Sequence, residues 1–116
     1  LTHAVEGYTS KKASPLTDVY AVDAVKRIFQ YLPRAYENGE DMEAREEMIL
    51  AALEAGVVIN NSSVTLVHGM SRPIGANFHV PHGLSNAMLL KVCLTFALDG
   101  TYERVTNIRK ASRNTA

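Results

Sequence analysis

Residues 14–33 read SPLTDVYAVDAVKRIFQYLP, and this stretch indicates the class of fold. Its apolar residues recur at intervals of three and four, a spacing that places them on one face of an α-helix. The residues with this spacing are Leu16, Val19, Tyr20, Ala24, Val25, Ile28, Phe29 and Leu32. Ser14 and Pro15 are typical of a helix start, and Pro33 is expected to end the helix.

Helical patterns continue on both sides of this stretch. Residues 1–10, LTHAVEGYTS, resemble the middle of a helix. Downstream, Asp41 is placed to accept the free backbone N–H groups of a helix that starts at Met42 and runs towards Val58. Strand signals are nearly absent, because β-branched residues do not alternate with polar ones beyond residues 57–59.

The second half of the chain predicts three further helical segments. A short helix carries Leu66, Val67, His68 and Met70 and is expected to bend near Pro73. The next starts at Pro81 and runs to about Leu98, where the pair Asp99 and Gly100 should break it. Residues 102–113 can form a basic amphipathic helix. The predicted fold is therefore an all-α helical bundle that forms a single domain over residues 1–116.

Composition excludes several classes of partner. The chain has 116 residues, of which 47% are hydrophobic, and its 12 basic residues balance its 12 acidic ones. A balanced charge argues against binding to nucleic acid or to an anionic membrane surface. The longest apolar run, residues 48–59, contains Glu54 and is too short to span a bilayer. The lone Cys93 is expected to be a small buried hydrophobic residue in a reducing compartment, by default the cytoplasm.

Two segments, residues 48–59 and 84–98, are apolar nearly all round. Such helices are typically buried on several sides, and a bundle of this length can enclose only about one of them. The pattern therefore predicts a further covering partner, either another domain or a second copy of the chain. We expect a homodimer or a higher oligomer.

The four histidines are the candidates for chemistry. They are His3, His68, His79 and His82, and three of them lie within residues 68–82. Neutral imidazole is a common ligand of iron, zinc, cobalt and nickel when several histidines converge from different elements. A single histidine is more often a surface residue or a hydrogen-bonded core residue, and the spacing alone does not decide between these readings.

The stretch from His68 to Leu90 resembles the metal signature of the iron-containing (group III) alcohol dehydrogenases. It carries HGMSRPIGA at residues 68–76 and PHGLSNAMLL at residues 81–90. The resemblance extends upstream through residues 1–28 and 32–56, and it covers about residues 1–105. It implies that the chain is a fragment of that family's C-terminal helical, metal-binding domain.

In that family a divalent metal, iron or zinc, is held by one aspartate and three histidines. The resemblance places the three histidines at His3, His68 and His82, and it gives His79 no such role. The aspartate would lie four residues before His3, ahead of Leu1. The metal would polarise the oxygen of an alcohol or carbonyl substrate while NAD(P) exchanges a hydride with the carbon.

The family's nucleotide-binding domain is not expected within residues 1–116. The seven glycines never form the G-x-G pattern of a pyrophosphate-binding turn. We therefore expect the isolated chain to be inactive. As part of an intact parent enzyme, the chain would belong to an NAD(P)-dependent oxidoreductase. The alternative, from another class, is a non-catalytic helical module that self-associates or binds a protein partner.

Arg72 stands where many family members carry a further histidine near the nicotinamide. It follows His68 by four residues and so shares one helix face with it. Arg72 could bond to backbone or a carboxylate, or it could contact an anion on the cofactor or on an acidic substrate. It is the candidate cofactor-binding residue, and an anion contact would favour a carboxylate-bearing substrate.

Overall fold

The computed structural model describes residues 1–113, and this part of the chain consists of helices and connecting loops with no strand. The helices are α1 (Thr2–Thr9), α2 (Pro15–Glu37), α3 (Met42–Asn60), α4 (Leu66–Phe78) and α5 (His82–Arg113). The all-α prediction is thus confirmed. The last three residues of the predicted domain, 114–116, lie outside the described part. None of the described helices is long and apolar enough to cross a membrane.

The predicted starts of α2 and α3 are confirmed by their capping bonds. At the start of α2, the Ser14 hydroxyl accepts a hydrogen bond from the Thr17 backbone N–H at 3.3 Å, and the Thr17 hydroxyl accepts one from the Ser14 N–H at 2.9 Å. At the start of α3, the Asp41 carboxylate accepts from the Ala44 N–H at 3.0 Å. These bonds satisfy backbone donors that have no partner within their helix.

The predicted helix end at Pro33 is wrong, whereas the bend expected near Pro73 stays a prediction. Helix α2 does not end at Pro33 but continues to Glu37, and α4 passes Pro73 and runs to Phe78. A proline removes only its own N–H from the helical ladder, so flanking bonds can carry the helix past it. In α2 the last turn is held by the ion pair of Arg34 with Asp41, at 2.9 Å.

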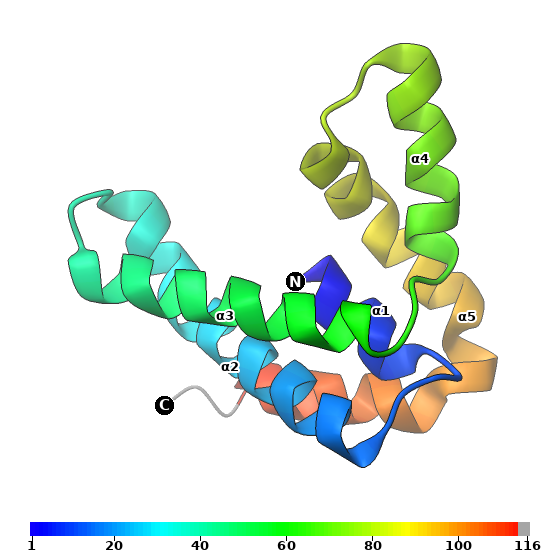
Figure 1. Cartoon of the computed structure of the whole chain (residues 1–116), viewed down its shortest axis with the longest axis horizontal. Coiled ribbons are helices and arrows are strands. Elements are labelled where there is room, and N and C mark those ends of the chain that lie inside the picture. The colour runs from blue at the N-terminus through cyan, green and yellow to red at the C-terminus, as the bar shows by residue number, and fades with distance from the viewer. Residues whose placement is uncertain (114–116) are drawn as a thin grey trace.

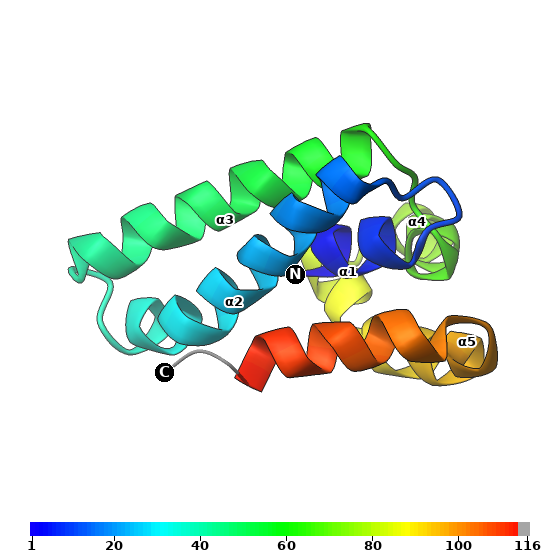
Figure 2. The ribbon, with the colours of Figure 1, turned by 90° about the horizontal axis from the view of Figure 1, so that it is seen from below.

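The predicted helix end at Asp99 and Gly100 is also wrong, because α5 runs from His82 to Arg113. A straight helix of 32 residues would be about 48 Å long. In the structure α5 is bent rather than straight, and the molecule extends 35 Å along its longest axis (Figures 1 and 2). The change of direction lies in the orange part of the ribbon, and the red end then runs back beneath α1 and α2 (Figures 1 and 2).

Small residues make up most of the core, which lets the helices approach closely. Helices α2 and α3 lie side by side, and α1 is enclosed between this pair and the C-terminal half of α5 (Figure 2). The main buried cluster contains Ala4, Val5, Ala24, Val25, Ala55 and Ala111. Helix α4 and the first turns of α5 form a separate arm beside the N-terminal end of α1 (Figure 1).

Residues 48–59 and 84–98 are not covered on several sides within the described residues 1–113, and the partner expected to cover them stays a prediction. Their large side chains are mostly exposed, with 69% of Ile49, 64% of Leu53 and 81% of Phe96 accessible. The buried positions of α3 carry Ala51, Glu54, Ala55 and Val58. The prediction of a buried Cys93 is confirmed, since it is 3% exposed.

Candidate metal centre

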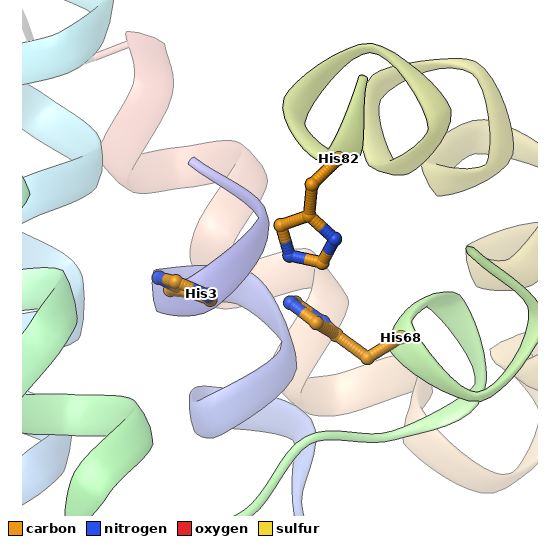
Figure 3. A group of neighbouring side chains, drawn as sticks. All are labelled: His3, His68 and His82. Carbon is orange, nitrogen blue, oxygen red and sulfur yellow. The ribbon is translucent and has the colours of Figure 1, made fainter. Parts of the chain in front are cut away.

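The structure brings His3, His68 and His82 together from three different helices. His3 lies in α1, His68 lies in the first turn of α4, and His82 is the first residue of α5. One ring nitrogen of each lies within 4.8 Å of the others (Figure 3). The His3 and His68 rings stack with centroids 5.0 Å apart, and the His82 ring is tilted, 5.1 Å from that of His68.

The cluster has a buried side and an open side. His68 is 2% exposed, His3 is partly exposed and His82 is exposed. Burial, followed by the charge of the neighbouring His68, lowers the pKa of His3 below its ordinary value. A lowered pKa favours the neutral imidazole, which is the form that binds a metal ion.

A buried carboxylate, Glu6, was missed by the sequence reasoning. It is 1% exposed, and its Oε2 bonds to Nδ1 of His68. Its Oε1 accepts hydrogen bonds from the Thr65 N–H at 3.1 Å, the Thr65 hydroxyl at 2.5 Å and the Val67 N–H at 2.8 Å. The available signal was that Glu6 is the one charged residue in THAVEGYT and follows His3 by three residues, on the same helix face.

Asn86 was also missed, although it follows His82 by four residues in α5. Its amide Nδ2 lies 3.3 Å from Nε2 of His68 and 3.1 Å from Nε2 of His82. The amide can donate to both nitrogens only where they carry a lone pair. The Asn86 Oδ1 is buried and has no hydrogen-bond partner among residues 1–113.

This arrangement suits a divalent cation. Nε2 of His68 and Nε2 of His82 both lie within hydrogen-bond distance of the Asn86 amide, so the two nitrogens face one shared volume. Nitrogens bound to one ion lie about 3 to 4 Å apart, and the cluster is within small side-chain rotations of that spacing. A hollow of about 350 Å³ adjoins the open side and is lined by His3, His82 and Asn86.

The sequence offered two other candidates, Arg72 and His79. Arg72 is exposed on α4, and its guanidinium has no hydrogen bond or ion pair within residues 1–113. His79 is the C-cap of α4, in the left-handed region with φ of 55°. The structure does not group His79 with the other three histidines.

Comparison with known proteins identifies relatives that belong to one family of alcohol dehydrogenases. Residues 1–115 match the model of the Fe-containing alcohol dehydrogenase family, C-terminal. The NAD-dependent methanol dehydrogenase of Bacillus methanolicus is 43% identical over 108 residues, which are 93% of this chain and 28% of the relative. The 1,3-propanediol dehydrogenase of Citrobacter freundii is 40% identical over the same shares of the two chains.

A solved structure agrees with these relatives. The alcohol dehydrogenase from Oenococcus oeni superposes with a TM-score of 0.95 at 32% identity, over 97% of this chain and 30% of that one. The chain thus spans less than a third of the length of the relatives it matches. The predicted resemblance is confirmed, and the chain belongs to the Fe-containing alcohol dehydrogenase family, matching its C-terminal helical domain.

Proposed function

We propose that this chain supplies the metal-binding part of an NAD(P)-dependent alcohol dehydrogenase, with His3, His68 and His82 as ligands of a divalent ion, Fe²⁺ or Zn²⁺. The observation that carries the proposal is the convergence of these side chains from three helices on one point. His68 and His82, which are 65 and 79 positions from His3 in the sequence, meet it although residues 1–113 contain no strand or disulfide that would hold them together.

The three histidines would have two different roles: one would hold the ion on its buried side, and two would bind it where a substrate can reach it. Buried His68 anchors the site, because its ring is enclosed and bonded on both sides. His3 and His82 face the hollow, where an alcohol oxygen could reach the ion. When bound there, the ion would act as a Lewis acid on that oxygen during hydride transfer to NAD(P).

The hollow also indicates the kind of substrate group that this chain can receive. Beside the histidines and Asn86, its walls consist mainly of small residues, including Ala52, Ala55, Gly83 and Ala87. Such walls can contact the carbon chain of a small alcohol while leaving its oxygen against the polar side. The named relatives act on methanol and on 1,3-propanediol, which are small alcohols of this kind.

Arg72 is proposed to contact an anion, either a phosphate of the cofactor or the carboxylate of an acidic substrate. Its exposed guanidinium on α4 is free of protein partners within residues 1–113, so it is available for this role. Titration with inorganic pyrophosphate should give weaker binding to Arg72→Ala than to the wild type. Equal affinities would exclude the role.

Metal titration tests the proposed ligands. The purified chain is titrated anaerobically with Fe²⁺ and separately with Zn²⁺, and bound metal is measured by elemental analysis. We expect about one ion per chain, together with a rise in the melting temperature, because an ion that binds only the folded state stabilises it. His68→Ala should lose both effects. Stoichiometric binding that survives in His68→Ala would refute the proposed ligand set.

A matched control removes a histidine outside the cluster. His79→Asn deletes an imidazole while keeping a side chain that tolerates the positive φ at this position. It should bind metal as tightly as the wild type. Loss of binding in both variants would point to a general effect of histidine removal rather than to this site.

A second function, self-association, is supported by the exposed apolar residues. Ile49 and Met48 line a hollow of about 350 Å³ between α2 and α3, together with Leu32 and Tyr36. We propose that a second copy of the chain covers this face, since apolar area left in water costs about 25 cal/mol per Å². Light scattering at micromolar concentration should show a dimer or higher oligomer, and Ile49→Ser should shift it towards monomer. A monodisperse wild-type monomer would refute this.

A cytoplasmic location is proposed from the free thiol of Cys93, which is buried and has no disulfide partner. Burial raises the pKa of this thiol and so lowers its reactivity. Fractionation of cells that produce the chain, with detection by antibody, should recover it with cytoplasmic markers. Recovery with another compartment would overturn the assignment.

A further inference from the structure

Glu6 connects the proposed metal centre to the start of α4. It sits one turn after His3 in α1, is almost completely buried, and reaches across to α4, whose N-cap residue Thr65 makes no capping bond of its own. One carboxylate oxygen, Oε1, takes three donors from Thr65 and Val67 and a longer contact from the His68 N–H at 3.4 Å. The other, Oε2, bonds to Nδ1 of His68.

The two carboxylate oxygens of Glu6 therefore bind different groups. All the groups around Oε1 are N–H or O–H donors, so this position requires an acceptor. At Oε2 an ionised carboxylate can only accept, so Nδ1 of His68 must carry the proton of that bond. In the neutral ring this leaves the lone pair on Nε2, which lies on the side of the cluster towards His82.

We propose that Glu6 is the positioning residue of the metal centre: it fixes the His68 ring in the Nδ1–H tautomer and aims Nε2 at the ion. The inference rests on the proposed function, since it assigns a role in the same site. A carboxylate behind a histidine ligand also makes the imidazole more basic, and loss of such a partner typically weakens metal binding 10-fold to 100-fold. Both carboxylate oxygens of Glu6 already have partners within this chain, so Glu6 is proposed to act through His68 and not as a ligand.

Glu6→Gln is the sharpest test because the amide has the same shape as the carboxylate but cannot serve both positions. Its oxygen is needed where Oε1 accepts three donors. The amide NH₂ then takes the place of Oε2 and donates to Nδ1, which drives the His68 proton onto Nε2. We expect Zn²⁺ and Co²⁺ affinity to fall 10-fold to 100-fold, while the helical circular dichroism signal is retained.

The matched control is Glu54→Gln, which makes the same change at another buried glutamate. Glu54 is 9% exposed and lies in α3, beside Arg27 and away from the histidines. It should leave metal affinity unchanged. Equal metal affinity of Glu6→Gln and wild type would overturn the role of Glu6. Equal loss in both glutamine variants would also overturn it, because the loss would then follow from a change at any buried glutamate.

The tautomer provides a readout that a merely structural role would not move, and the wild-type spectrum alone can overturn the proposal. Long-range ¹H–¹⁵N correlation spectra of the metal-free wild type at pH 8 should show His68 protonated on Nδ1, and those of Glu6→Gln should show it protonated on Nε2. An Nε2–H tautomer in the wild type overturns the proposal even if Glu6→Gln fails to fold.

The two proposals fail in distinguishable ways. If the wild type binds neither Zn²⁺ nor Co²⁺, or if His68→Ala binds them unchanged, the metal site itself is refuted and the role of Glu6 falls with it. If His68→Ala loses binding while Glu6→Gln keeps it, the metal site stands and only the positioning role is refuted.

Discussion

Replacement of Gly7 by alanine should destabilise the protein, although alanine is the better helix former. A Cβ atom at Gly7 would lie 2.4 Å from Cγ1 of Val58 and 2.8 Å from Oγ of Ser62. Ordinary contacts between such atoms are about 3.5 to 4 Å. Val58 is completely buried, and a β-branched side chain has little rotational freedom, so it cannot turn away. Helices α1 and α3 would have to separate by about 1 Å.

The expected magnitude follows from two opposing terms. Overpacking a close contact costs about 1 to 3 kcal/mol, and an overlap of this size belongs near the upper end. Replacing glycine by alanine within a helix returns about 1 kcal/mol. The net loss in the free energy of unfolding for Gly7→Ala is therefore about 2 kcal/mol, equivalent to a fall of roughly 8 °C in melting temperature for a chain of this size.

Gly56→Ala is the matched control, because an added Cβ in α3 would meet no atom within 4 Å. It should gain about 1 kcal/mol from helix propensity alone. Urea denaturation followed by circular dichroism at 222 nm measures both variants, which should differ by about 3 kcal/mol. Gly7→Ala should also bind Zn²⁺ more weakly, since α1 carries His3. Equal stability of the two variants would refute the close-packing argument.

Three further variants test the charge, capping and burial arguments. Burial, and then the adjacent Asp23, raise the pKa of Glu54 from 4.5 to about 7, so the folded state holds a proton that the unfolded state releases in this window. The contribution of Glu54 to the free energy of unfolding therefore falls as the pH rises from 4.5 to 7, and the ion pair with Arg27 at 3.5 Å partly offsets this loss. Glu54→Gln should flatten the dependence of stability on pH and gain about 1 to 3 kcal/mol at pH 8. An unchanged pH dependence would contradict the raised pKa of Glu54. Ser14→Ala removes the capping box of α2 and should lose about 1 kcal/mol in urea denaturation. Cys93→Ser places a hydroxyl at a site that is 3% exposed and should lose about 1 to 2 kcal/mol, whereas an unchanged midpoint would show that the site is wet.

The helix starts were predictable because their determinants are local. Ser14 and Thr17, and likewise Asp41 and Ala44, are three residues apart, and their bonds form within a single turn. The predicted helix ends failed for the opposite reason. The local cost at Pro33 and at Gly100 is a few kcal/mol at most, and neighbouring turns and tertiary packing offset it.

The sequence by itself determined the helical class, the helix starts and, through the resemblance of residues 68–90, the three histidines of the candidate metal site. Only the tertiary structure decided how these histidines are supported. Glu6 contacts residues 59 to 62 positions away, and no periodic pattern records a bond over such a separation. Its burial depends on α1 being enclosed by α2, α3 and α5, and the tight fit at Gly7 depends on where α3 lies. These features arise from packing between helices, which local spacing along the chain does not specify.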